Sequence, residues 1–122
     1  MPETRGITVA ETTLFIRQAA VVWSEDERSA FVDFIALNPE AGDLVPDTGG
    51  VRKVRWSRQG SGKRGGVRVI YFYHHLDAPL YLLMVYTKAA RDDLSPEAKR
   101  IVQELVARLK RAIRPKGGRR QR

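Results

Sequence analysis

Residues 49–73 read GGVRKVRWSRQGSGKRGGVRVIYFY, and this stretch decides the fold. Two runs rich in β-branched and aromatic residues, Val51–Trp56 and Val67–Tyr73, predict β-strands. The segment between them, 57–66, is rich in Gly, Ser, Lys and Arg and predicts a connecting loop. We therefore expect two neighbouring strands of one sheet at the centre of the chain.

The same stretch is strongly basic. Seven Lys and Arg residues fall within 17 positions, and no Asp or Glu occurs between residues 48 and 76. These cations are Arg52, Lys53, Arg55, Arg58, Lys63, Arg64 and Arg68. Positive charge placed along paired strands forms a surface suited to a polyanion, most often nucleic acid.

Charge is also distributed unevenly between the two parts of the chain. It has 122 residues and a formal net charge of +8, with −6 carried by residues 1–47 and +14 by residues 48–122. At 43% hydrophobic residues the chain can bury a core. We expect one domain over residues 1–113 and a basic, disordered tail over residues 114–122.

Composition also excludes several classes of protein. There are no cysteines, so disulfides and thiolate zinc sites are excluded, which fits a reducing cytoplasm. No apolar run approaches the roughly 20 residues that span a bilayer, and the first residues lack the core of a signal peptide. We expect a cytoplasmic protein with no membrane partner.

Upstream of the basic stretch the sequence predicts one strand and two helices. Residues 7–10 form a short strand, and residues 14–22 form a helix capped by a threonine, although residues 21–23 could also be extended. Ser24 and Glu27 form a capping box, and the helix that they begin ends before Pro39.

Downstream, the chain adds a strand and a final helix. The apolar run 80–87 predicts an interior strand, and Ser95 caps a helix whose apolar stripe extends to Ile113. Residues 115–118, Pro-Lys-Gly-Gly, are expected to end it. The order β-α-α-β-β-β-α predicts an α+β fold with a small, mainly antiparallel sheet.

Three cations of the two central strands are candidates for binding a phosphate. Side chains alternate along a strand, so Lys53 and Arg55 share the face opposite Val54 and Trp56. They could equally be basic residues that protect an edge strand from aggregation. Arg68, on the following strand, is placed for bidentate contact with a phosphate, or else forms a surface ion pair.

Other candidates carry weaker signals. The loop residues Lys63 and Arg64 could clamp phosphates, but the spacing of a P-loop is absent. Lys88 and Arg91 follow the third strand and could join the same groove. The adjacent His74 and His75 have no third ligand or carboxylate partner in the pattern, so no metal or cofactor is expected.

The sequence contains no Ser/His/Asp set and no paired carboxylates of the usual hydrolase types. If the protein is an enzyme, its cations must perform the catalysis. RNA makes this feasible, because its own 2′-OH can be the nucleophile and the protein only has to align it and stabilise negative charge.

The motifs GGVRKVRW (residues 49–56) and GKRGGVRVIY (residues 62–71) together closely resemble the RelE/HigB-type toxins of bacterial toxin–antitoxin modules. The nearest match is the branch called HigB-2. The likeness extends over residues 7–110 and includes the start of the last helix at Asp92-Asp93-Leu94-Ser95.

This resemblance implies a RelE-like fold and a toxin that cleaves mRNA in the ribosomal A site by attack of the 2′-OH on the adjacent phosphate. It implies an antitoxin partner, expected to carry a helix-turn-helix. The matching catalytic positions are Lys53, Arg55 and Arg68, and the residues expected to contact RNA or ribosome are Lys63, Arg64, Lys88, Arg91 and Tyr71.

One departure from the family pattern leaves an alternative open. Some relatives place a C-terminal tyrosine in the site, but residues 91–122 contain none, so that role is vacant or is filled by Tyr71, Tyr73 or Tyr86. The alternative is a noncatalytic domain of the same fold that binds nucleic acid or an antitoxin.

Overall fold

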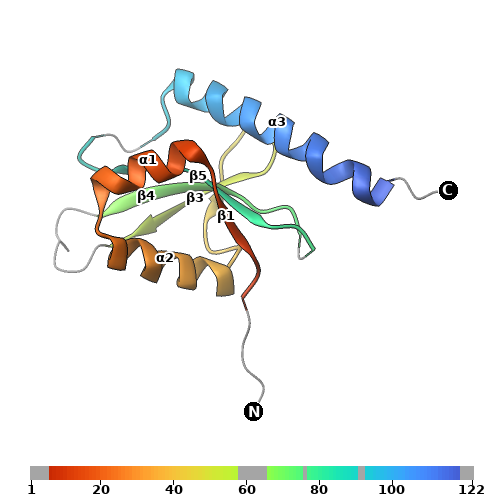
Figure 1. Cartoon of the computed structure of the whole chain (residues 1–122). Coiled ribbons are helices and arrows are strands. Elements are labelled where there is room, and N and C mark those ends of the chain that lie inside the picture. Colours follow the sequence, from red (N-terminus) through yellow and green to blue (C-terminus); the bar gives the residue numbers. More distant parts are fainter. Residues whose placement is uncertain (1–5, 58–65, 76, 91–92, 119–122) are drawn as a thin grey trace, which may run out of the picture.

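The computed structural model describes residues 6–57, 66–75, 77–90 and 93–118, with side chains as far as residue 112. These residues form a five-stranded sheet and three helices (Figure 1). In chain order the elements are β1 (Val9–Glu11), α1 (Thr13–Val22), α2 (Glu25–Leu37), β2 (Asp43–Leu44), β3 (Val51–Trp56), β4 (Val67–Phe72), β5 (Leu80–Thr87) and α3 (Pro96–Gly118).

The strands lie in the order β1-β5-β4-β3-β2. β1 pairs with β5 in parallel, and the other three pairs are antiparallel. The predicted α+β fold with a mainly antiparallel sheet is therefore confirmed. β5 has a neighbour on each side, as its continuous apolar sequence indicates, and β4 at the centre is buried along its whole length.

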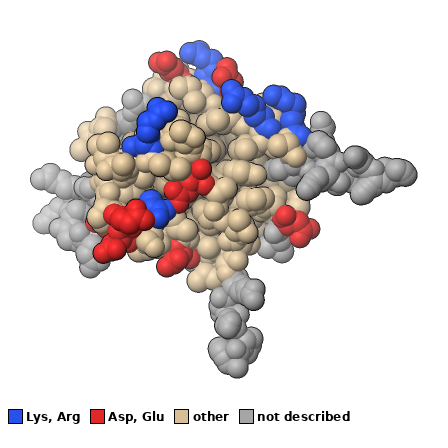
Figure 2. Space-filling model, viewed as in Figure 1, with Lys and Arg blue, Asp and Glu red and all other residues tan. Residues whose placement is uncertain are grey.

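Helices cover both faces of the sheet, with α1 and α2 on one face and α3 on the other (Figure 1). Figure 2 shows Lys and Arg side chains along α3, and acidic side chains gathered where α1 and α2 meet. The separation of charge between the two halves of the sequence is only partial in space, because Asp43 of the first half lies beside Lys53 and Lys99 of the second.

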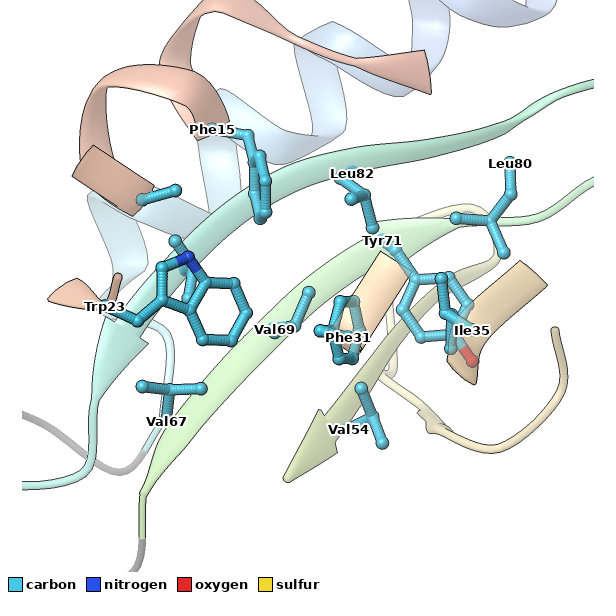
Figure 3. Packing of buried hydrophobic residues seen from close by; sticks show 12 residues of the cluster. Phe15, Trp23, Phe31, Ile35, Val54, Val67, Val69, Tyr71, Leu80 and Leu82 are labelled. Carbon is cyan, nitrogen blue, oxygen red and sulfur yellow. The ribbon is translucent and has the colours of Figure 1, made fainter. Parts of the chain in front are cut away.

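Alternation along β4 divides its side chains between two core clusters. Val67, Val69 and Tyr71 pack with α1 and α2, whereas Ile70 and Phe72 pack with α3. Figure 3 shows the first cluster, in which aromatic rings from both helices lie against the strands. Because β4 contributes to both clusters, the register of β4 determines which of its side chains lie on each face of the sheet.

The helix starts are those that the sequence predicts. The Thr12 side chain caps α1 by accepting a hydrogen bond from the Phe15 amide at 3.1 Å. Ser24 and Glu27 form the complete capping box of α2. Ser95 accepts from the amide of Ala98 at the start of α3. These caps satisfy amides that have no partner within the helix.

Three details differ from the sequence predictions. β1 is Val9–Glu11, shifted toward the C-terminus from the expected 7–10, and Asp43–Leu44, expected as a turn and loop, forms the additional edge strand β2. The predicted end of the last helix near Ile113 is wrong, because α3 continues to Gly118. Pro115 disfavours a helix but does not end this one, whose last residues are glycines, which are common at helix C-termini.

Candidate nucleic-acid interface

Lys53, Arg55 and Arg68, here called the cation cluster, lie on the same face of the sheet. Arg55 is paired with Arg68 across β3 and β4, and Arg68 is paired with Tyr86 on β5. Lys53 is two residues from Arg55 and so points to the same side, about 7 Å along the strand. This is the face that α3 packs against, as Ile70 and Tyr86 of the second core cluster show.

The three cations differ in their access to solvent. Arg55 is exposed, the Lys53 side chain is 21% exposed, and Arg68 is only 3% exposed. Buried arginines are rare in proteins unless they are paired, and Arg68 does have interacting groups around it. The central strand β4 therefore holds a positive charge inside the molecule, directly beside an exposed one.

Lys53 forms an ion pair with a residue far from it in the sequence. Its ammonium group lies 2.6 Å from a carboxylate oxygen of Asp93, in the segment between β5 and α3. Both residues line a hollow of about 410 Å³ whose other walls are mostly apolar. Those walls are Asp43, Leu44, Val45, Pro46, Leu94 and Lys99.

A larger hollow, of about 570 Å³, lies between β1, α1 and α2. Its cation, Arg28, is paired with the carboxylates of Glu11 and Glu25. Arg28 lowers the pKa of Glu25 below its ordinary value, chiefly through their hydrogen bond. With two carboxylates on one guanidinium, this hollow offers no excess positive charge to a phosphate. The hollow beside Lys53 is formally neutral, with Lys53 and Lys99 against Asp43 and Asp93, and differs in lying next to Arg55 and Arg68.

Tyr71, expected to contact RNA, lies on the other face of the sheet from the cation cluster. It is fully buried, and its hydroxyl donates to the Pro39 carbonyl and accepts from the Gly42 amide, each at 2.8 Å. Alternation along β4 points it toward α1 and α2, away from Arg68. Of the three tyrosines considered, Tyr86 alone packs on the face that carries the cation cluster, since Tyr73 packs with the first core cluster.

The remaining candidates are distributed as follows. Lys88 is exposed directly after β5, and its amide donates to the Gly66 carbonyl at 3.2 Å, which places it at the end of the sheet where β4 begins. Lys63, Arg64 and Arg91 lie outside the described residues.

The two histidines are exposed and lie beyond the end of β4. The His74 ring stacks on Phe72 with 6.0 Å between centroids, and the His75 Nδ1 atom accepts from the Asp77 amide at 3.1 Å. Within the described part of the chain, no three His, Cys, Asp or Glu side chains are grouped so as to hold a metal ion. His75 thus has a local structural contact within its own turn.

Asp93 is the residue that sequence reasoning missed, because Asp92-Asp93 was interpreted only as the start of a helix. Its contact partner Lys53 is 40 residues away in the sequence. One signal in the sequence could have indicated it. Asp93 is an acid in the same segment after residues 80–87 in which Lys88 and Arg91 were predicted to join the groove.

Taken together, the fold and the cation cluster define a small basic α+β protein with three cations grouped on one face of its sheet. A family model for the RelE toxin of the RelE/RelB toxin–antitoxin system matches residues 37–116, from the end of α2 through most of α3. The match includes the whole cation cluster and Lys88. The chain belongs to the RelE toxin family, whose members are toxins of toxin–antitoxin systems and have an antitoxin partner.

Among the helices of the described residues, none is both long enough and apolar enough to cross a membrane.

Proposed function

We propose that this toxin is an endoribonuclease that cleaves mRNA on the ribosome and so inhibits translation. The observation that carries the proposal is the position of Lys53, Arg55 and Arg68 on one face, in a family of toxins. Three neighbouring cations suit one RNA phosphate and the charge that develops on it during cleavage.

In the proposed reaction the 2′-oxygen of a ribose attacks the adjacent phosphorus. The O2′–P bond forms as the P–O5′ bond breaks, leaving a 2′,3′-cyclic phosphate and a 5′-hydroxyl end. The proton of the 2′-OH is lost and the departing 5′-oxygen gains one. Because the nucleophile belongs to the substrate, the protein contributes alignment and charge stabilisation, and the proposal includes no metal or cofactor.

Each cation has a role in this proposal. Lys53 and Arg55 bind the nonbridging oxygens of the scissile phosphate. Arg68, buried on β4 beside Arg55, stabilises the negative charge that develops on the phosphate in the transition state. Lys88 holds the RNA backbone at the end of the sheet, together with the residues proposed from the resemblance, Lys63, Arg64 and Arg91. Tyr86, the register partner of Arg68, takes the tyrosine position that the C-terminal region lacks.

The finer assignments belong to the same proposal. The joined motifs at residues 49–56 and 62–71 support the HigB-2 branch and, with it, an antitoxin that carries a helix-turn-helix. Ribosomes and mRNA are the proposed targets, which makes the cytoplasm the place of action.

The test is to induce variants in bacteria, follow growth and map the ends of mRNAs. Arg55→Gln removes an exposed cation and should reduce cleavage about 10²–10³-fold, the usual effect of removing one electrostatic contact to a transition state. Arg68→Gln should do the same, with circular dichroism to verify folding. The matched control is Arg17→Gln, which removes an exposed cation from α1 and should leave growth arrest intact.

A noncatalytic RelE-like domain is the second candidate. Two observations favour it: Lys53 is engaged by Asp93, and Arg68 is only 3% exposed. A domain of this kind would bind nucleic acid or an antitoxin without cutting RNA. Intact transcripts after induction of a folded protein would support it, whereas cuts within translated codons would support the nuclease.

A further inference from the structure

The contact between Lys53 and Asp93 joins a cation of the proposed site to the protein's own carboxylate. The Asp93 side chain is 81% exposed and comes from the segment before α3, whereas the Lys53 side chain is 21% exposed and belongs to β3. The two therefore meet at the surface, on the rim of the hollow next to the cation cluster.

The start of α3 has its own stabilising groups and does not require Asp93. Ser95 caps the helix by accepting from the Ala98 amide at 3.1 Å, and Glu97 supplies the acid of the first turn. Capping and a first-turn acid are the usual devices at a helix N-terminus. The ion pair with Lys53 is thus a separate feature of Asp93.

A carboxylate oxygen and a nonbridging phosphate oxygen offer the same interaction to an ammonium group, namely a charge-assisted hydrogen bond. We propose that Asp93 is a positioning residue that occupies Lys53 in the free protein and is displaced by the RNA phosphate, so that Lys53 exchanges an internal anion for an external one. This inference rests on the proposed function, since it assumes that RNA binds at the cation cluster.

Such an exchange lowers the affinity of the site for anions that contact Lys53 alone. An exposed ion pair contributes little, equivalent to about two- to fivefold in affinity, and salt weakens it further. A phosphate that also contacts Arg55 gains binding free energy there, which offsets the loss of the Lys53–Asp93 pair. An isolated anion that contacts only Lys53 has no such gain. Asp93 would therefore discriminate in favour of RNA backbone that is correctly placed over the cluster.

The experiment is a double-mutant cycle on binding, which separates the pair from general electrostatics. The full-length protein and its Asp93→Asn, Lys53→Gln and double variants are titrated with a short single-stranded RNA whose riboses are 2′-O-methylated, so that cleavage is blocked. Fluorescence anisotropy at about 0.1 M salt, where the Debye length is about 10 Å, reports the affinity.

We expect Asp93→Asn to bind this RNA about two- to fivefold more tightly than the wild type, the effect of releasing one exposed ion pair. In the Lys53→Gln background the same change should give no gain. The matched control, Glu97→Gln, also removes one negative charge near the start of α3 and should give a smaller gain that does not depend on Lys53.

Three results would overturn the inference while leaving RNA binding intact. These are weaker binding by Asp93→Asn, an equal gain with and without Lys53, or a gain from Glu97→Gln as large as that from Asp93→Asn. If the wild-type protein did not bind RNA at all, the proposed function and this inference would both fall. Binding with the expected coupling but without cleavage in cells would reject only the nuclease.

Discussion

The two faces of the sheet use the same strands for different purposes. On the face covered by α1 and α2, hydrophobic side chains fill the space between helices and strands, with Phe31 lying 5.3 Å from Trp56 and 5.7 Å from Trp23 between ring centroids. On the other face, α3 packs over Ile70 and Phe72, and the neighbouring positions are cationic. One face provides stability, and the other combines stability with charge.

This division depends on the alternation of side chains in β3 and β4. Val54 and Trp56 contribute to the first core cluster, whereas the intervening Arg55 belongs to the cation cluster. The well-packed face can hold the strands rigid while their other face carries charges that repel one another. We therefore expect substitutions on the first face to change stability, and substitutions in the cation cluster to change RNA binding.

The largest expected effect is on the face of α1 and α2. Phe31 is fully buried among Trp23, Phe34 and Trp56. Phe31→Ala should lower the free energy of unfolding by about 3–5 kcal/mol, since it removes apolar contacts and leaves a cavity. Urea denaturation followed by tryptophan fluorescence measures this loss.

Phe31→Leu, which keeps most of the volume, is the matched control and should cost less. The folded fraction of either variant should bind RNA as the wild type does, because Phe31 lies on the side of the sheet away from the cation cluster. A loss below about 1 kcal/mol in Phe31→Ala, the average for any substitution, would show that the two faces do not divide their roles in this way.

Local periodicity explains why the sequence predicted so much of the fold. The alternation in residues 51–56 assigned Lys53 and Arg55 to one face without any knowledge of the sheet, because the period of two is a property of the strand itself. The capping box at Ser24 and Glu27 is likewise complete within four residues. Both predictions are confirmed in the structure, as is the α+β architecture that they support.

Features that depend on distant contacts were harder to predict. Tyr71 alternates with Arg68 and Ile70, so its face could have been deduced, but its hydroxyl partners Pro39 and Gly42 lie about 30 residues upstream. The contact of Asp93 with Lys53 also joins segments far apart in the chain, 40 residues from each other. No local pattern encodes such pairs, because they arise only when the sheet and α3 assemble.

A smaller effect, still on the first face, should follow from removing the Tyr71 hydroxyl. Tyr71→Phe leaves the buried Gly42 amide without its partner and should cost about 1–3 kcal/mol. Burial raises the pKa of Tyr71 above its ordinary value of 10.0, so its contribution is complete below pH 10.0 and is lost as the pH rises through the raised pKa. The difference in unfolding free energy between wild type and variant should therefore shrink in alkali.

RNA affinity gives the contrasting measurement for Tyr71. If the hydroxyl supports only the turn at residues 39–42, folded Tyr71→Phe should bind RNA and arrest growth as the wild type does. If Tyr71→Phe were as stable as the wild type but bound RNA more weakly, Tyr71 would be part of the RNA interface. The two faces of the sheet would then not have separate roles.

The smallest expected effect concerns the ion pairs that Arg28 forms within α2 and with β1. Arg28 lowers the pKa of the exposed Glu25 carboxyl below its ordinary value of 4.5, first through their hydrogen bond and then through the charge of Arg28. The pair therefore stabilises the fold fully above pH 4.5 and loses its effect as the pH falls through the lowered pKa. Glu25→Gln should be slightly less stable than wild type near neutral pH and equal to it in strong acid.

Chemical denaturation at several pH values measures this difference in unfolding free energy, which added salt should also reduce. If Glu25→Gln were still less stable than wild type in strong acid, Glu25 would act through packing and not through its charge.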